Sequence, residues 1–328
     1  MTVAAARRPV DARRRWLLLL LVGAAVLILG AQIVVIGPRA ISRILVQIDG
    51  VWACLALLAI VIGGVIGGIN SWVLVAQPEG VPIGKFLAHY WTGWAVGQVA
   101  PGQIGDTLTI SALLKGHNIP LKRSLAGLGI DKVLSLLVSL AAVCALPLIL
   151  VGMHASWITL SVLLLSVVLA LVMPQLGRIE QRLRLAIRYH KVREALEMVG
   201  NAGRLVDERP LAVAANLLVS VVKLGVTGFA FWCGLRAVQL PLPLNELPAI
   251  TVCAASAGLI AYLPLSLNGI GTVEATGIVL FGALGLPPAA VLAAYLLLRC
   301  ATLLAAWGPA AGIHLAAYFT AAKLHRES

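Results

Sequence analysis

Two carboxylates, Asp106 and Glu274, lie within or beside strongly apolar segments of the chain. An ionised group in that setting costs roughly 2.5 to 3.5 kcal/mol on insertion scales, so we expect it to have a charged partner or a functional role. The candidate partners are two cations, Lys132 and Arg299, each one turn into a long apolar stretch that follows its carboxylate. Together these four groups could bind a phosphate, gate a path or carry a proton.

Both carboxylates follow an apolar segment that proline and glycine interrupt. The interrupting residues are Pro101, Gly102 and Gly105 in the first segment and Pro264, Gly269 and Gly271 in the second. The spacing from Pro120 to Lys132 equals that from Pro287 to Arg299, whereas the carboxylates align only with a one-residue gap. Paired interrupted segments indicate a substrate site between two transmembrane repeats, because unwound backbone at membrane depth survives only where it lines a cavity.

Two interpretations of these charged groups stay open. In the functional one, the cations bind a lipid phosphate, the carboxylates serve gating or a proton, and the half-helices that begin after Gly105 and Gly271 add backbone donors for an anion. In the structural one, the carboxylates only cap those half-helices, and the cations extend toward the membrane interface.

Lys223 lies near the middle of the apolar stretch 210–236. A lysine at mid-membrane depth normally faces a cavity or a carboxylate, so it is a candidate for the substrate path and equally for helix pairing. Asp131 directly precedes Lys132 in the first motif and is also a candidate for substrate binding or coupling.

Neutral polar and aromatic residues add weaker candidates. Five could line the same cavity or form hydrogen bonds between helices, namely Asn70, Gln98, Gln103, Ser266 and Asn268. Four are expected in an aromatic belt at the membrane interface, namely His89, Tyr90, Trp91 and Trp94. The glycines from Gly63 to Gly68 suit close helix packing.

The composition places most of the chain in a membrane. Hydrophobic residues make up 60% and charged residues 12% of 328 residues, which excludes a soluble domain. The net charge of +12 lies at the ends of apolar runs and in one polar loop, so it fits topology and anionic lipid head groups better than nucleic acid. The sequence lacks a phosphate-binding loop, a zinc motif, an acidic metal cluster and a nucleophile elbow. We therefore expect no cofactor, no metal and no enzymatic activity.

The elements that must position these residues are helices. Six full spans are predicted, at 16–36, 51–75, 124–150, 157–174, 210–236 and 288–318. Two apolar but interrupted regions, 86–114 and 244–286, are predicted to be broken helical hairpins, although each could instead cross the membrane twice. The predicted fold is an all-α polytopic membrane protein.

The distribution of basic residues predicts the topology. It gives a cytoplasmic N-terminus at 1–15, a first membrane half at 16–174, a cytoplasmic amphipathic basic linker at 175–209, a second membrane half at 210–320 and a cytoplasmic tail at 321–328. Arg39 and Arg43 are the clear violations. The two hairpins then enter from opposite faces, which makes the repeats inverted, as in alternating-access transporters.

The two motifs resemble the signatures of the lysylphosphatidylglycerol synthase transmembrane, or flippase-like, family. The matching residues are Pro101-Gly102-x-x-Gly105-Asp106 with Asp131-Lys132, and Leu263-Pro264 to Gly269-Ile270-Gly271-x-x-Glu274 with Arg299. The resemblance covers nearly the whole chain. The chain departs from the family at Gly105-Asp106, where Gly-Glu and a following Arg are usual, and at Asp131-Lys132, where Glu-Arg is usual.

The resemblance implies a lipid flippase in the cytoplasmic membrane of a prokaryote, acting on aminoacylated phosphatidylglycerol or a polyprenyl-phosphate sugar. Uphill movement would need a coupling ion, and Asp106 and Glu274 are where a proton could bind. A lipid-modifying enzyme is a candidate partner. The 328 residues contain no aminoacyl-transferase domain, so we expect no aminoacylation of lipid by this chain. Two alternatives stay open: an integral-membrane transferase acting on a lipid phosphate, and a non-transporting accessory subunit.

Overall fold

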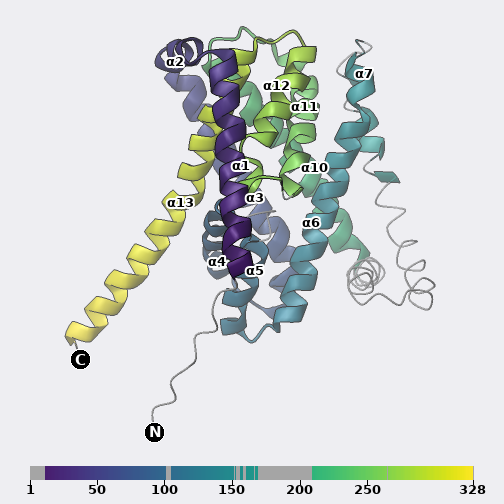
Figure 1. The fold of residues 1–328 in the computed structure, drawn as a ribbon. Coiled ribbons are helices and arrows are strands. Elements are labelled where there is room, and N and C mark those ends of the chain that lie inside the picture. The colour runs from purple at the N-terminus through teal and green to yellow at the C-terminus, as the bar shows by residue number, and fades with distance from the viewer. Residues whose placement is uncertain are drawn as a thin grey trace.

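The structure is a computed structural model that describes residues 12–100, 105–150, 152, 156–157, 160–165, 167–168, 209–263 and 265–327. Over this part, the chain forms α-helices and short 3-10 turns without strands (Figure 1). The α-helices are α1 (Ala12–Ile36), α2 (Pro38–Val46), α3 (Gly50–Val75), α4 (Ile83–Gly97), α5 (Gly105–Leu114), α6 (Leu121–Cys144), α7 (Leu146–Leu150), α10 (Pro210–Ala237), α11 (Leu247–Leu259), α12 (Thr272–Ala283) and α13 (Pro288–Glu327). The predicted all-α class is confirmed.

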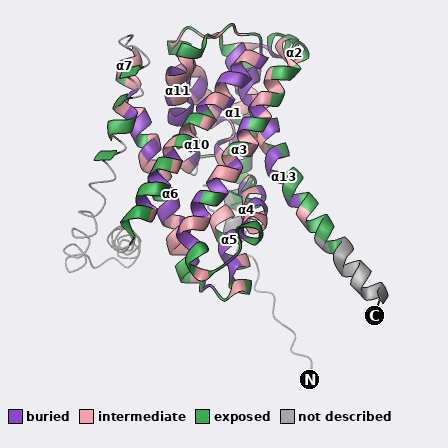
Figure 2. Cartoon of the chain, turned by 180° about the vertical axis from the view of Figure 1, so that it is seen from behind, coloured by how far each residue is buried: buried purple, intermediate pink, exposed green. Residues whose placement is uncertain are grey.

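Six segments of the described chain are long and apolar enough to cross a membrane. They are Leu18–Ile36, Gly50–Val75, Leu121–Ile149, Pro210–Ala237, Leu244–Tyr262 and Pro288–Ala316. Five match predicted full spans. The other, Leu244–Tyr262, belongs to the predicted second hairpin, and half of the predicted span 157–174 lies outside the described residues. Large apolar side chains on the outer surface agree with a lipid environment, including those along the part of α13 that extends beyond the bundle (Figure 2).

The first predicted hairpin is formed by α4 and α5, which pack against each other. Gly93 and Gly97 on α4 lie against Ile110 and Asp106 on α5, so two small residues four positions apart allow the helices to approach closely. The 10 residues of α5 extend only about 15 Å, half of the roughly 30 Å hydrocarbon core. Alone, α5 is therefore too short to span a membrane.

The second hairpin is formed by α11 and α12. The 12 residues of α12 extend about 18 Å, also less than the hydrocarbon core. Between the two helices the backbone turns through Asn268, Gly269 and Gly271, which all have positive φ. At Gly271 (φ +85°) a side chain would also meet Ile28 of α1 at 2.9 Å, so glycine is required both for the turn and for the approach of α1.

The tips of the two hairpins meet inside the bundle. Asn268 Nδ2 donates hydrogen bonds to the backbone oxygen of Gln98 at 3.2 Å and to its side-chain oxygen at 3.4 Å. The α4–α5 pair lies in one half of the bundle and the α11–α12 pair in the other (Figure 1). Entry of the hairpins from opposite membrane faces stays a prediction. Pro101, Gly102, Pro264 and nearly all of the linker 175–209 lie outside the described residues.

The glycine run on α3 provides a close contact with α4. A side-chain atom added at Gly64 would meet Trp94 at 2.8 Å, and one added at Gly67 would meet the Tyr90 hydroxyl at 2.6 Å. The predicted role of these glycines in close helix packing is confirmed. This contact brings the aromatic side chains of α4 into the interior of the bundle.

The two arginines that violate the predicted charge distribution share a short amphipathic helix, α2. Ile41 is buried and Ile44 packs beside it, whereas Arg39 and Arg43 are exposed. A short helix with an apolar inner face and a basic outer face suits the surface of a membrane, where arginines can contact lipid phosphates.

Candidate functional site

A cavity of about 490 Å³ lies where the two hairpins meet. Residues of α3, α4, α5, α6, α10, α11, α12 and α13 line it, so both halves of the chain contribute. The charged residues among the described lining are Asp106, Lys132, Lys223, Glu274 and Arg299. Sequence analysis singled out all five, and the fold brings them to one cavity.

The first carboxylate forms the ion pair that its sequence context predicts. Asp106 Oδ2 lies 2.5 Å from Lys132 Nζ. Its other oxygen accepts hydrogen bonds from the backbone N–H of Thr107 at 2.7 Å and from the Thr107 hydroxyl at 3.2 Å. Asp106 therefore bonds to the first turn of α5 while it neutralises the cation on α6.

The second carboxylate repeats this arrangement with deeper burial. Glu274 is 1% exposed, and its Oε1 lies 2.6 Å from Arg299 Nε. Its Oε2 accepts a hydrogen bond from the backbone N–H of Gly271 at 2.6 Å, which closes the first turn of α12. Arg299 also donates to the backbone oxygen of Asn268 at 3.3 Å. Each carboxylate thus bonds to the first turn of a half-helix and pairs with a cation, while the functional interpretation stays a prediction.

The two cations lie at equal depth in their helices. Lys132 stands 11 residues after Leu121, where α6 begins, and Arg299 stands 11 residues after Pro288, where α13 begins. This distance is about three helical turns, or roughly 17 Å, so the prediction that each lies one turn inside its span was wrong. From this depth both side chains bond to a carboxylate at the cavity and do not extend to the membrane interface.

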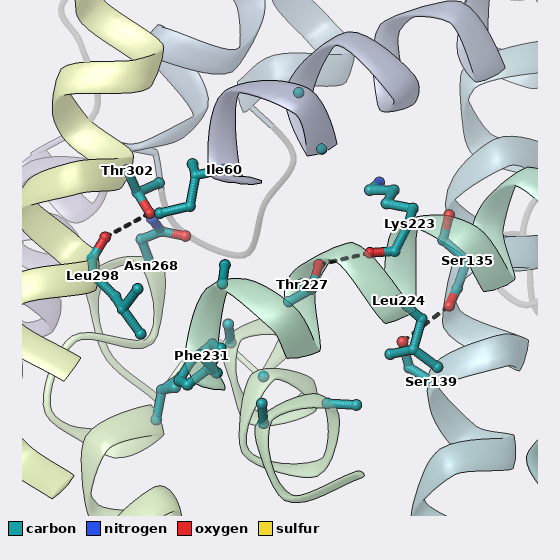
Figure 3. Close-up of a pocket in the computed structure, with 18 of the residues that line it drawn as sticks. Ile60, Ser135, Ser139, Lys223, Leu224, Thr227, Phe231, Asn268, Leu298 and Thr302 are labelled. Carbon is teal, nitrogen blue, oxygen red and sulfur yellow. Dashed lines mark hydrogen bonds between the residues drawn. The ribbon is translucent and has the colours of Figure 1, made fainter. Parts of the chain in front are cut away.

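Lys223 is the lining cation without a carboxylate partner among the described residues. It lies halfway along α10, and its Nζ is next to Gly67 of α3. Figure 3 shows Lys223 and Ser135 on one side of the cavity and Asn268 and Thr302 on the other. The described lining has three cations and two carboxylates, and a third carboxylate, Asp131, acts electrostatically on Lys223 from behind the cavity wall.

Asp131 does not line this cavity, although sequence analysis grouped it with the site. It is 7% exposed and accepts hydrogen bonds from Asn70 Nδ2 at 3.0 Å, Ser71 Oγ at 2.8 Å and Asn216 Nδ2 at 2.9 Å. These donors belong to α3 and α10, whereas Asp131 belongs to α6. The carboxylate thus holds three helices together behind the cavity wall.

Replacement of Asp131 by leucine is expected to destabilise the protein by about 3 kcal/mol or more, since buried donors left without an acceptor cost about 1–3 kcal/mol each. Asp131→Asn keeps one acceptor oxygen and is expected to lose less. Thermal unfolding in detergent micelles measures both variants. An unchanged unfolding temperature for Asp131→Leu, together with lost activity, would move Asp131 from the scaffold to the functional site.

The neutral polar candidates separate into two groups. Gln98 and Asn268 line the cavity. Asn70 instead bonds to Asp131, and the Ser266 hydroxyl lies 3.0 Å from that of Thr272. Gln103 lies outside the described residues.

The aromatic residues of α4 are not arranged as the predicted interfacial belt. Tyr90 and Trp94 line the cavity, and Trp91 is buried with its Nε1 donating to the backbone oxygen of Ala305 at 2.8 Å. His89 instead reaches the 3-10 turn that follows α5, where its Nε2 lies 3.0 Å from Nε2 of His117. The belt prediction was therefore wrong for the three larger rings, because α3 presents glycines to them.

Hydroxyl residues of the lining were missed by sequence analysis. The Ser and Thr residues each lie near a lining cation on the same helix: Ser135 and Ser139 follow Lys132, Ser220 precedes and Thr227 follows Lys223, and Thr302 follows Arg299. Their offsets of three, four or seven residues keep them on one helical face with the cation, so helical periodicity could have found them. Among the described residues, no group of three or more His, Cys, Asp or Glu is placed to hold a metal.

Comparison with known proteins agrees with this architecture. A family model described as the lysylphosphatidylglycerol synthase TM region matches residues 16–308 of the chain. No curated protein matches it. The matched region contains every residue that lines the cavity, and it indicates a role connected with membrane lipids.

Proposed function

The chain belongs to the lysylphosphatidylglycerol synthase TM region family, and from this premise we propose that it moves a lipid with an anionic or phosphate-linked head group across the membrane. The head group occupies the cavity while the hydrocarbon tails stay in the apolar surroundings. The chain carries out this movement without a covalent change to the lipid. Its site of action is the cytoplasmic membrane of a prokaryote, with both termini on the cytoplasmic side.

The observation that carries the proposal is Lys223, a cation of the cavity lining that forms no ion pair with a described carboxylate. Lys132 and Arg299 are each neutralised by a carboxylate, whereas Lys223 has no such partner in the described part of the chain. An ammonium group in a largely apolar bundle is costly, and an incoming phosphate would offset that cost by forming charge-assisted hydrogen bonds. The hydroxyls of Ser135 and Thr302 can supply further donors.

The two ion pairs supply the candidate coupling step. A phosphate that takes a hydrogen bond from Lys132 or Arg299 competes with the carboxylate already bound to that cation. The displaced carboxylate then favours a proton, because an unpaired carboxylate at membrane depth is costly. We propose this exchange as the link between lipid movement and a proton, with a lipid-modifying enzyme as the candidate supplier of the lipid.

Lipid movement in proteoliposomes tests the proposal. The purified protein is reconstituted with fluorescent phosphatidylglycerol or with a polyprenyl-phosphate sugar, with and without a pH gradient. We expect protein-dependent movement of one lipid, and its loss in Glu274→Gln, which removes the charge paired with Arg299. A lipid product of altered mass would support the transferase alternative. The absence of movement and of product under every condition would support an accessory role.

A further inference from the structure

A second hollow, of about 320 Å³, lies between α3 and α10 next to the cavity. Every residue that lines this α3–α10 groove is apolar. They are Leu55, Leu58, Ala59 and Ile62 from α3, and Val222, Gly225, Val226 and Phe229 from α10. On each helix the spacing is i, i+3, i+4 and i+7, which places the lining residues on one face.

The groove and the cavity share a wall. Ala59 and Val226 line both of them. The wall is thin, because Gly63 faces Val226 across the helix pair without a side chain of its own. Lys223 lies one turn from Val226 and lines the cavity, so the cation without a carboxylate partner lies close to this wall.

Contacts between α3 and α10 lie on both sides of this wall, and small residues stand among those at the wall itself. Toward one end, the rings of Trp52 and Trp232 meet edge to face with their centroids 5.1 Å apart. Toward the other end, Asn70 Nδ2 donates to Ser220 Oγ at 3.2 Å. Between these contacts stand Ala59, Gly63 and Gly225.

We propose that the α3–α10 groove binds a hydrocarbon chain of the lipid whose head group occupies the cavity. This inference rests on the proposed function. A lipid needs a polar site and an apolar site side by side, and the groove adjoins the cavity across Ala59 and Val226. Its rim residues Leu58 and Val222, 54% and 49% exposed, suit contact with surrounding lipid.

Filling the groove tests the assignment. Gly225 lines the groove and is exposed, and a Cβ added there would meet nothing within 4 Å, so Gly225→Leu is the variant chosen to fill the groove. Gly308→Leu on α13 is the matched control, because Gly308 is also an exposed glycine in a long span with nothing within 4 Å. We expect Gly225→Leu to slow lipid movement on the order of tenfold, an effect typical of one misfitting group in an apolar pocket, and the control to match wild type.

Binding of sn-glycerol 3-phosphate, a head group without tails, separates the two proposals. Gly225→Leu is expected to bind it as wild type does. If wild type moves lipid and Gly225→Leu moves it at the rate of Gly308→Leu, the groove assignment is wrong and the proposed function stands. If wild type neither moves lipid nor binds sn-glycerol 3-phosphate, both proposals fail.

Photolabelling of the wild-type protein gives an answer that does not depend on how a variant folds. Phosphatidylglycerol with a diazirine in one acyl chain is expected to label the α3 segment 55–62 and the α10 segment 222–229. Labelling concentrated on α12 or on the outer part of α13 would overturn the assignment. A diazirine in the head group should instead label residues of the cavity.

Discussion

Replacement of Arg299 by alanine is expected to destabilise the folded protein by about 3–5 kcal/mol, the effect of removing one partner from a buried ion pair. Glu274 is 1% exposed, and Arg299 is its charged partner. Without the guanidinium, the carboxylate must stay ionised without compensation or take up a proton. Thermal unfolding in detergent micelles measures the loss.

A charge-neutral pair separates stability from function. In Glu274→Gln/Arg299→Gln no unpaired charge is left, so we expect most of the stability to return while lipid movement stays lost. The corresponding pair of the first half, Asp106 and Lys132, serves as a matched comparison because its side chains are more exposed, at 17% and 31%. Lys132→Ala should therefore cost less stability than Arg299→Ala. Wild-type unfolding of Arg299→Ala would show that the ion pair does not hold the second hairpin.

Replacement of Lys223 by methionine is expected to weaken binding of the anionic lipid by about 10- to 150-fold, which corresponds to the loss of a hydrogen bond to a charged group. Methionine keeps much of the length and the apolar stem of the side chain and removes its charge and its N–H donors. Because no carboxylate partner is left unpaired in the described part of the chain, the unfolding temperature should stay constant or rise. Binding of sn-glycerol 3-phosphate and movement of phosphatidylglycerol are the measurements.

The control for this prediction is Lys223→Arg, which keeps the positive charge and should retain most of the binding. A neutral lipid such as diacylglycerol supplies a second comparison, since its affinity should not depend on Lys223. Equal binding of the anionic lipid by wild type and Lys223→Met would remove Lys223 from the site. The proposed function would then rest on the two ion pairs alone.

These two predictions differ in sign for stability because the cations have different surroundings. Arg299 compensates a carboxylate that is nearly inaccessible to solvent, so removing the arginine lowers the free energy of unfolding. Lys223 forms no such ion pair among the described residues, so removing it takes away the cost of a charge in the apolar bundle. Scaffold residues raise the stability of the folded protein, whereas a binding residue without its ligand often lowers it. The same cavity contains both kinds of residue.

The charged residues of the cavity were predictable from the sequence because each is an exception in an apolar segment. A carboxylate after a proline- and glycine-interrupted stretch must find a cation or a cavity, so the pairs Asp106–Lys132 and Glu274–Arg299 followed from type and order alone. Composition determined the membrane class in the same way. These inferences needed no knowledge of how the helices pack, since the cost of a charge in hydrocarbon is independent of the fold.

Only the tertiary structure decided which polar residues face the cavity and which hold the scaffold. Asp131 and Lys132 are neighbours in sequence, but consecutive residues of a helix point about 100° apart, so the lysine lines the cavity and the aspartate bonds to α3 and α10. The sequence did not predict the α3–α10 groove either. Helices that are apolar on all sides carry no pattern that tells a lipid-facing side from a helix-facing side, because lipid tails are as apolar as the side chains packed against them.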